Sequence, residues 1–143
     1  MRVKQLSVFL ENKSGRLAEV LSLLAKAGVN LRALSLADTR DFGVLRVIVD
    51  DVARAHTVLK EHGVTASETE VLAVEVPDQP GGLAGILELL GRQNVSVEYM
   101  YAFVAKSGDK AIMVFRFDNL DQAAGALQRG GVRILTGKEL YSL

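Results

Sequence analysis

Cysteine is absent from the 143-residue chain, so disulfides, thiol nucleophiles and cysteine-based metal sites are all excluded. Net charge is absent too, because 17 basic and 17 acidic side chains balance. This balance argues against a nucleic-acid binder that works through a broad basic field. No apolar run approaches the roughly 18 residues of a membrane-spanning helix. We therefore expect a cytoplasmic protein with no membrane contact, no nucleic-acid partner, no metal and no cofactor.

What the chain does have is apolar material for a core, since hydrophobic residues make up 49% of it. Residues 1–13 combine a basic start with a short apolar run and no small-residue cleavage site. We expect them to form a strand and not a signal peptide.

An internal repeat organises the sequence. Residues 11–17 align with 77–83, and residues 27–30 with 93–96, both at an offset of 66. Residues 49–51 align with 117–119, and residues 62–64 with 130–132, both at an offset of 68. The two extra residues fall in the turn-like stretch 106–109, where an insertion costs little. The repeat predicts two domains, residues 1–69 and 70–143.

Each copy has the same hydrophobic periodicity. In the first copy, alternation predicts strands at 3–10, 29–37 and 45–49, with a turn at 40–43. Helical spacing predicts a first helix ended by Gly28 and a second helix capped by Asp51 and ended by Gly63. A short fourth strand at 64–70 then adjoins the first strand of the second copy, 71–76. The fold class is therefore α+β: two ferredoxin-like βαββαβ units, each with an antiparallel sheet and helices on one face.

The second copy follows the same plan with local variations. Asn119 and Gln122 fit a capping box at the start of its second helix. Tyr99, Tyr101 and Phe103 share one face of its second strand. Their spacing favours core packing beneath the helices over a ligand or partner surface.

Two motifs, each present twice, resemble those of the ACT domain family, the small regulatory modules that bind amino acids. Residues 11–17 (ENKSGRL) and 77–83 (PDQPGGL) resemble the family's strand-to-helix loop, and residues 27–31 (AGVNL) and 94–97 (NVSV) resemble its helix exit. The resemblance covers nearly the whole chain and implies a tandem pair of ACT domains.

The strand-to-helix loop has chemistry that suits an amino acid. Gly15 and Gly81 allow unusual backbone angles and a close approach, and the following helix presents unpaired N–H groups to an anion. The plainer interpretation is that these residues form only a cap and a turn. The resemblance implies a ligand site at Asn12, Ser14, Gly15, Arg16, Leu17, Asn30 and Leu31, and a second at Asp78, Pro80, Gly81, Gly82, Leu83, Ser96 and Tyr99.

The second strand of the first copy is apolar and is expected at a sheet edge. Leu31, Ala33, Leu34 and Leu36 leave Arg32 as its one charged residue, and such an edge invites pairing with another edge. We therefore expect a homodimer formed through sheet edges.

Other chemistry has little support in the sequence. His56 and His62 lie six residues apart and do not share a helix face, so we expect surface or cap roles. Asp50 and Asp51 fit helix capping. An RNA-recognition domain shares the topology, but Phe115 and Phe117 align with core-facing positions of the first copy.

The sequence thus predicts no enzyme, but a regulatory protein that senses a free amino acid and modulates a partner in amino-acid metabolism. Two alternatives stay open: an assembly subunit similar to the small subunit of acetolactate synthase, and a pairing module without a ligand. Which amino acid binds and which partner responds are not given by the sequence.

Overall fold

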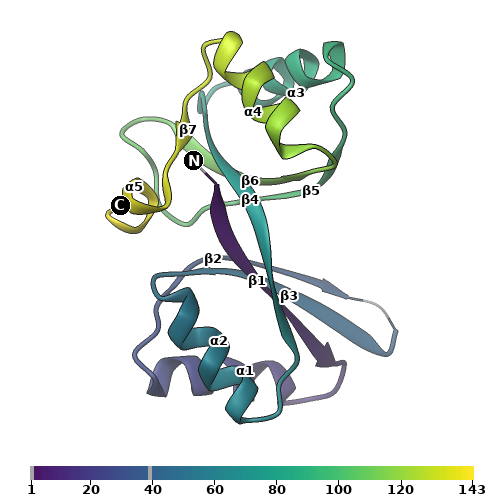
Figure 1. Cartoon of the computed structure of the whole chain (residues 1–143), viewed down its shortest axis with the longest axis vertical. Coiled ribbons are helices and arrows are strands. Elements are labelled where there is room, and N and C mark those ends of the chain that lie inside the picture. Colours follow the sequence, from purple (N-terminus) through teal and green to yellow (C-terminus); the bar gives the residue numbers. More distant parts are fainter. Residues whose placement is uncertain (1, 39) are drawn as a thin grey trace. The chain divides into compact units, whose positions relative to one another are not determined.

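The computed structural model describes residues 2–38 and 40–143, which form two compact units (Figure 1). The N-terminal unit comprises Lys4–Thr69, and the C-terminal unit comprises residues 2 and 3 with Glu70–Leu143. Each unit has its own apolar core. Among the described helices, none has the length and apolar character needed to cross a bilayer.

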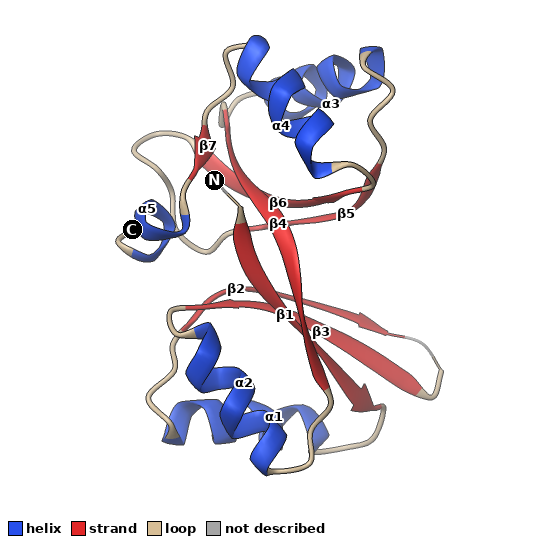
Figure 2. Cartoon of the chain, in the orientation of Figure 1, coloured by secondary structure: helices blue, strands red, loops and turns tan. Residues whose placement is uncertain are grey.

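The N-terminal unit is a sheet with both of its helices on one face (Figure 2). Its strands lie in the order β2-β3-β1-β4, and β3 runs antiparallel to β1 and β2. The elements, in chain order, are β1 (Val3–Glu11), α1 (Arg16–Lys26), β2 (Leu31–Asp38), β3 (Phe42–Val49), α2 (Val52–Glu61) and the beginning of β4 (Ala66–Val76).

The C-terminal unit repeats this plan. Its strands lie in the order β5-β6-β4, with β7 on the other side of β4, and all these pairs are antiparallel. Each unit therefore places its own strands in the order second, third, first, fourth, and the predicted ferredoxin-like βαββαβ fold is confirmed. After the rest of β4 come α3 (Gly82–Arg92), β5 (Val97–Ala102), β6 (Ala111–Phe117), α4 (Leu120–Arg129), β7 (Ile134–Leu135) and α5 (Gly137–Tyr141).

The junction between the repeats differs from the expectation of two successive strands. Residues 66–76 form one uninterrupted strand, β4, whose first part belongs to the N-terminal unit and whose second part belongs to the C-terminal unit. The sequence contains no Gly or Pro here that would break a strand. The predicted turn at 40–43 is also shorter, because β3 already begins at Phe42.

The two cores are built from the predicted apolar stripes. Val20 and Leu24 of α1 are buried in the N-terminal unit, and Ile86 and Leu90 of α3 are buried at the equivalent positions. Burial of such side chains is the main favourable contribution to folding, about 1.5–3 kcal/mol for each large aliphatic residue. The repeat found in the sequence is therefore also present in the packing of the two cores.

The aromatic residues divide between the two faces of the C-terminal sheet. Phe115 and Phe117 are fully buried against the helices and stack with ring centroids 5.2 Å apart, as their core-facing alignment predicts. Tyr99 and Tyr101 pair with Arg116 and Val114, which alternate with those phenylalanines and so lie on the opposite face. The prediction that these aromatics pack beneath the helices is therefore wrong, although Tyr101 and Phe103 are buried, 8% and 7% exposed, as core packing requires.

The helix caps follow the sequence in part. Asp51 accepts a hydrogen bond from the Arg54 N–H at 3.1 Å, and Asn119 accepts one from the Gln122 N–H at 3.0 Å, as expected. The predicted capping box is incomplete, since the Asn119 N–H donates to the Asp118 carboxylate at 2.9 Å, and the Gln122 side chain donates to the Gln93 carbonyl at 2.8 Å.

Candidate functional site

The two strand-to-helix loops have the same backbone geometry. Gly15 and Gly81 are the N-caps of α1 and α3, each with a left-handed φ of 83° and no side-chain cap hydrogen bond. A Cβ atom at either glycine would meet nothing within 4 Å, so the requirement for glycine comes from backbone strain and not from crowding. The N-cap conformation is thus the same in both repeats.

The internal hydrogen bonds of the loops match as well. In the N-terminal loop, the Lys13 N–H donates to the Glu11 carbonyl at 2.9 Å, and the Arg16 N–H donates to the Lys13 carbonyl at 3.2 Å. The equivalent bonds in the C-terminal loop run from Gln79 to Pro77 at 2.9 Å and from Gly82 to Gln79 at 3.0 Å.

Gly82 has a separate reason to be glycine. A Cβ atom there would lie 2.0 Å from the Pro77 carbonyl oxygen, far inside contact distance. The N-terminal loop has Arg16 at this position, and its guanidinium pairs with Glu19 at 3.0 Å on the same helix. The two loops therefore differ in how closely the chain approaches itself before the helix.

A hollow borders each loop at the end of its central strand. In the N-terminal unit it is small, about 50 Å³, and in the C-terminal unit it is about 450 Å³. Six lining positions are equivalent in the two repeats. The shared lining in the N-terminal unit consists of Leu10, Glu11, Asn12, Lys13, Leu17 and Gly43, and in the C-terminal unit of Val76, Pro77, Asp78, Gln79, Leu83 and Ala111.

The neighbouring β-hairpin contacts the loop in both units. Asn12 donates its Nδ2 to the Arg40 carbonyl at 3.3 Å, and its N–H donates to the Asp41 carbonyl at 3.0 Å. Asp78, the equivalent of Asn12, forms an ion pair with Lys106 from the β5–β6 hairpin. Asn12 and Asp78, which are expected to face a ligand, are thus each bound by the neighbouring hairpin of their own unit.

The predicted site residues do not all come together within one unit. Asn12, Leu17, Asp78, Pro80 and Leu83 line the loop hollows. Arg16 and the glycines at 15, 81 and 82 line a second groove along the first helix of each unit, about 520 Å³ in the N-terminal unit and 470 Å³ in the C-terminal one. Ser14 is exposed at the tip of its loop.

Asn30 and Ser96 lie at the other end of the first helix of each unit. The eleven residues of α1 or α3 separate them from the loop, a rise of about 16 Å. Leu31 and Tyr99 follow them on β2 and β5. Within one unit these four residues therefore form no common cavity with the strand-to-helix loop.

Asp50, which the sequence analysis assigned to capping, and its equivalent Asp118 bind the backbone at the start of a strand instead. The Asp50 carboxylate accepts the Asn30 N–H at 3.0 Å, and the Asp118 carboxylate accepts the Ser96 N–H at 3.1 Å. The aspartate N–H groups donate back to the Asn30 and Ser96 carbonyls, both at 3.2 Å. The identical bonds in the two repeats fix the start of β2 and β5, and the aligned Asp50 and Asp118 were the available signal.

The fold, the duplicated loop and the duplicated hollow define a pair of regulatory ACT domains. A family model described as ACT domain pair matches residues 1–143, and the chain belongs to that family. No curated protein matches the sequence significantly.

Solved structures share the fold of this chain. Protein BT0572 from Bacteroides thetaiotaomicron is 43% identical, with a TM-score of 0.93 over 100% of this chain and 98% of that one. The ligand-free regulatory subunit of aspartate kinase from Thermus thermophilus is 17% identical, with a TM-score of 0.63 over 90% of each chain. The corresponding subunit from Thermus flavus is 17% identical, with a TM-score of 0.54 over 90% of this chain and 92% of that one. The two aspartate kinase subunits share the fold.

Proposed function

We propose that this chain is a non-catalytic regulatory protein that binds a free amino acid at its strand-to-helix loops. The observation that carries the proposal is the duplication of one loop geometry, with a left-handed glycine before the helix and a hollow beside it, in a member of the ACT domain family. Six positions that line the hollow are equivalent in the two repeats, and its volume is larger in the C-terminal unit.

The loop chemistry suits a zwitterion. The N–H groups that follow Arg16 and Gly82 in the first turns of α1 and α3 have no acceptor within the helix, and the helix dipole makes this end partly positive, so it attracts a carboxylate. Asn12 and Asp78 line the adjacent hollows and offer oxygen acceptors to an ammonium group. The apolar lining by Leu17 or Leu83 would receive the side chain of the amino acid.

The residues at the start of the second strand enter the proposal through association. Asn30, Leu31, Ser96 and Tyr99 lie too far along their units to meet a ligand in the loop of the same unit. We propose that they complete a site when two sheet edges pair, which makes the protein a homodimer and links ligand binding to its assembly. A ligand that prefers the paired arrangement shifts the population toward it.

A thermal-shift screen of the full chain against each of the twenty amino acids tests the proposal. A ligand present at about 100 times its Kd stabilises the folded state by about 2.7 kcal/mol, which raises Tm by about 5–10 °C for a chain of this size. The amide and the deaminated acid of the best amino acid serve as controls, since each lacks one charge of the zwitterion. Equal shifts with these controls, or no shift with any amino acid, would contradict amino-acid binding.

An assembly module remains the second candidate, favoured by the exposure of Leu34 and Leu36 on the edge strand β2. These side chains are 43% and 48% exposed, a large apolar exposure for an edge. Such a module would associate through β2 with another chain and would show no response to any amino acid. Co-purification with an enzyme of amino-acid metabolism, without a thermal shift, would favour it over the sensor.

A further inference from the structure

The β5–β6 hairpin loop of the C-terminal unit contains the two residues that the first repeat lacks. It is closed by mutual backbone hydrogen bonds of 3.0 Å between Ser107 and Lys110. Lys106, next to this closure, reaches the loop before α3 and forms both an ion pair and a hydrogen bond with the Asp78 carboxylate. The insertion therefore bears directly on the hollow proposed for the ligand.

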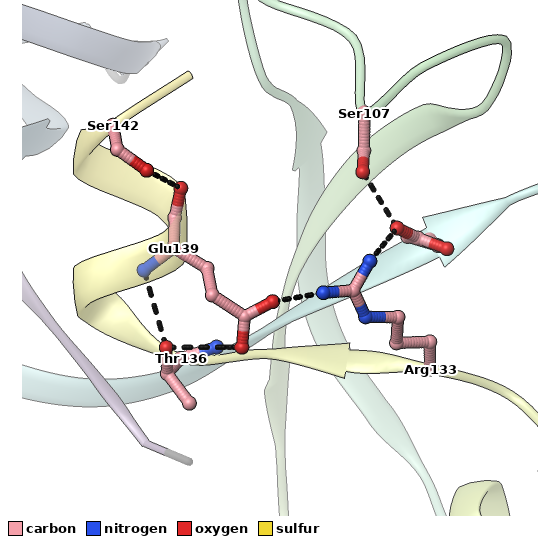
Figure 3. A network of polar contacts seen from close by, with 6 residues as sticks. Ser107, Arg133, Thr136, Glu139 and Ser142 are labelled. Carbon is pink, nitrogen blue, oxygen red and sulfur yellow. Dashed lines mark hydrogen bonds and ion pairs between the residues drawn. The ribbon is translucent and has the colours of Figure 1, made fainter.

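A polar network holds the hairpin in this position (Figure 3). The Ser107 hydroxyl donates to the Glu75 carboxylate at 2.6 Å, and Arg133 donates to the same carboxylate oxygen at 2.9 Å. The Glu75 side chain is only 10% exposed, whereas Arg133 extends to Glu139 at the start of α5. Since Glu75 lies on β4 just before the loop, this network fixes the hairpin close to Asp78.

The two hollows differ in charge at the position of Asn12 and Asp78, and the lining of the N-terminal one also contains the Lys13–Glu11 ion pair, 3.1 Å long. In the N-terminal unit, Asn12 is uncharged and contacts backbone carbonyls of its hairpin. In the C-terminal unit, the hairpin supplies a full positive charge to a full negative one. The hydrogen bond with Asp78, and next the charge of that carboxylate, raises the pKa of Lys106, so its ammonium persists at neutral pH.

We propose that Lys106 is a built-in competitor for the ligand ammonium group at Asp78, so that the two repeats bind a free amino acid unequally. The proposal rests on the proposed function. An amino acid that enters the C-terminal hollow must displace the Lys106 ammonium from Asp78, whereas Lys13, which lines the N-terminal hollow, pairs with Glu11 at 3.1 Å. Lys106 is thus a selectivity residue that lowers the affinity of the C-terminal site.

The exposure of the Lys106–Asp78 ion pair determines how much Lys106 lowers the affinity of the C-terminal site. The side chains of Lys106 and Asp78 are 59% and 51% exposed, and exposed ion pairs are weak and easily exchanged. Removing the lysine should therefore raise the affinity of the C-terminal site by about two- to fivefold. Salt should reduce the difference between the sites, because it screens the pair.

An amide NMR titration of the full chain tests the proposal at both sites at once. Each of the twenty amino acids is added to the wild type, Lys106→Met, Lys106→Arg and Lys110→Met, and the Gly15 and Gly81 amides are followed separately. Lys110→Met is the matched control, because it removes the same charge from the same hairpin without touching Asp78. Lys106→Arg keeps the cation and should behave as the wild type.

The expected result is a half-saturation at Gly81 that falls about two- to fivefold in Lys106→Met alone, with Gly15 unchanged in every variant. A Gly81 titration that is unchanged or weaker in Lys106→Met, while Gly15 still responds, overturns the competitor and leaves the amino-acid sensor standing. If neither amide responds to any amino acid in any variant, both proposals fail.

Discussion

Left-handed backbone positions mark the helix exits as well as the helix entries of this chain. Gly28 adopts a φ of 74° after α1, and Asn94, its equivalent after α3, adopts 56°. Asparagine tolerates this region better than most residues, yet it retains a Cβ and part of the steric penalty. The repeat has therefore kept the conformation while one copy has lost the residue that suits it best.

Replacing Asn94 by glycine should stabilise the protein. Removal of the Cβ penalty should raise the free energy of unfolding by about 0.5–1 kcal/mol, a part of the left-handed cost that glycine avoids. Urea denaturation measures the change, and the reciprocal Gly28→Asn should lower the same quantity by a similar amount. A destabilising Asn94→Gly would mean that the asparagine side chain contributes more than its backbone strain costs.

Residue types also show where prediction from the sequence reaches its limit. The glycines before and after the helices could be predicted because a positive φ selects for them directly. The contacts of Asn12 and Asp78 could not, because they depend on hairpins 28 residues further along the chain. Periodicity carries no information about such loop-to-loop contacts.

At the scale of elements, the length of a helix or strand decides whether its hydrophobic periodicity can be recognised in the sequence. The four long helices and the paired strands could be predicted because each presents at least two turns or several alternations to a core. The five-residue helix α5 presents too few positions, although its capping box at Thr136 and Glu139 is complete. Strand β4 was divided in the prediction because alternation cannot tell one long strand from two adjoining ones.

The capping box of α5 should be visible in the titration of Glu139. Its hydrogen bond from the Thr136 N–H lowers the pKa of Glu139, burial opposes this, and the Thr136 hydroxyl and Arg133 lower it further. The stabilisation is therefore complete above the unfolded-state pKa of about 4.3 and is lost as pH falls through the lower folded-state value.

Carboxyl-carbon NMR of the Thr136→Val variant measures how much the Thr136 hydroxyl lowers the pKa of Glu139. The variant should raise the pKa of Glu139 toward that of an ordinary glutamate, whereas Thr57→Val, an exposed threonine change on α2, should leave it where it is. An unmoved Glu139 titration in Thr136→Val would show that the hydroxyl is not part of the cap.

The edge strand β2 is the element on which the proposed homodimer depends. Leu36→Lys would place a charge in the apolar contact, and its desolvation should weaken self-association by about tenfold or more. Val104→Lys is the control, because Val104 is an exposed apolar residue, 67% accessible, on the hairpin of the other unit. Sedimentation equilibrium that shows equal association of Leu36→Lys and wild type would exclude β2 from the interface.

At the scale of the whole molecule, the internal repeat explains both the fold and the two proposed sites. Its offsets predicted the two βαββαβ units, and the equivalent loops, hollows and aspartate contacts extend it to the level of single hydrogen bonds. Where the copies depart from each other, at Asn12 and Asp78 and at the longer second hairpin, one protein can carry two sites of different affinity. That difference matters only if the loops bind a ligand.

Calorimetric titration of the best amino acid from the screen into a Gly15→Ala, Gly81→Ala double variant tests this central claim most directly. Both alanines strain a left-handed N-cap and change the loop, so the binding heat of the wild type should be lost. The matched double variant Gly63→Ala, Gly131→Ala carries the same strain at φ values of 71° and 75° after the other two long helices, and should bind as the wild type does. Binding retained in the loop variant and lost in the matched one would contradict the account and place the ligand elsewhere.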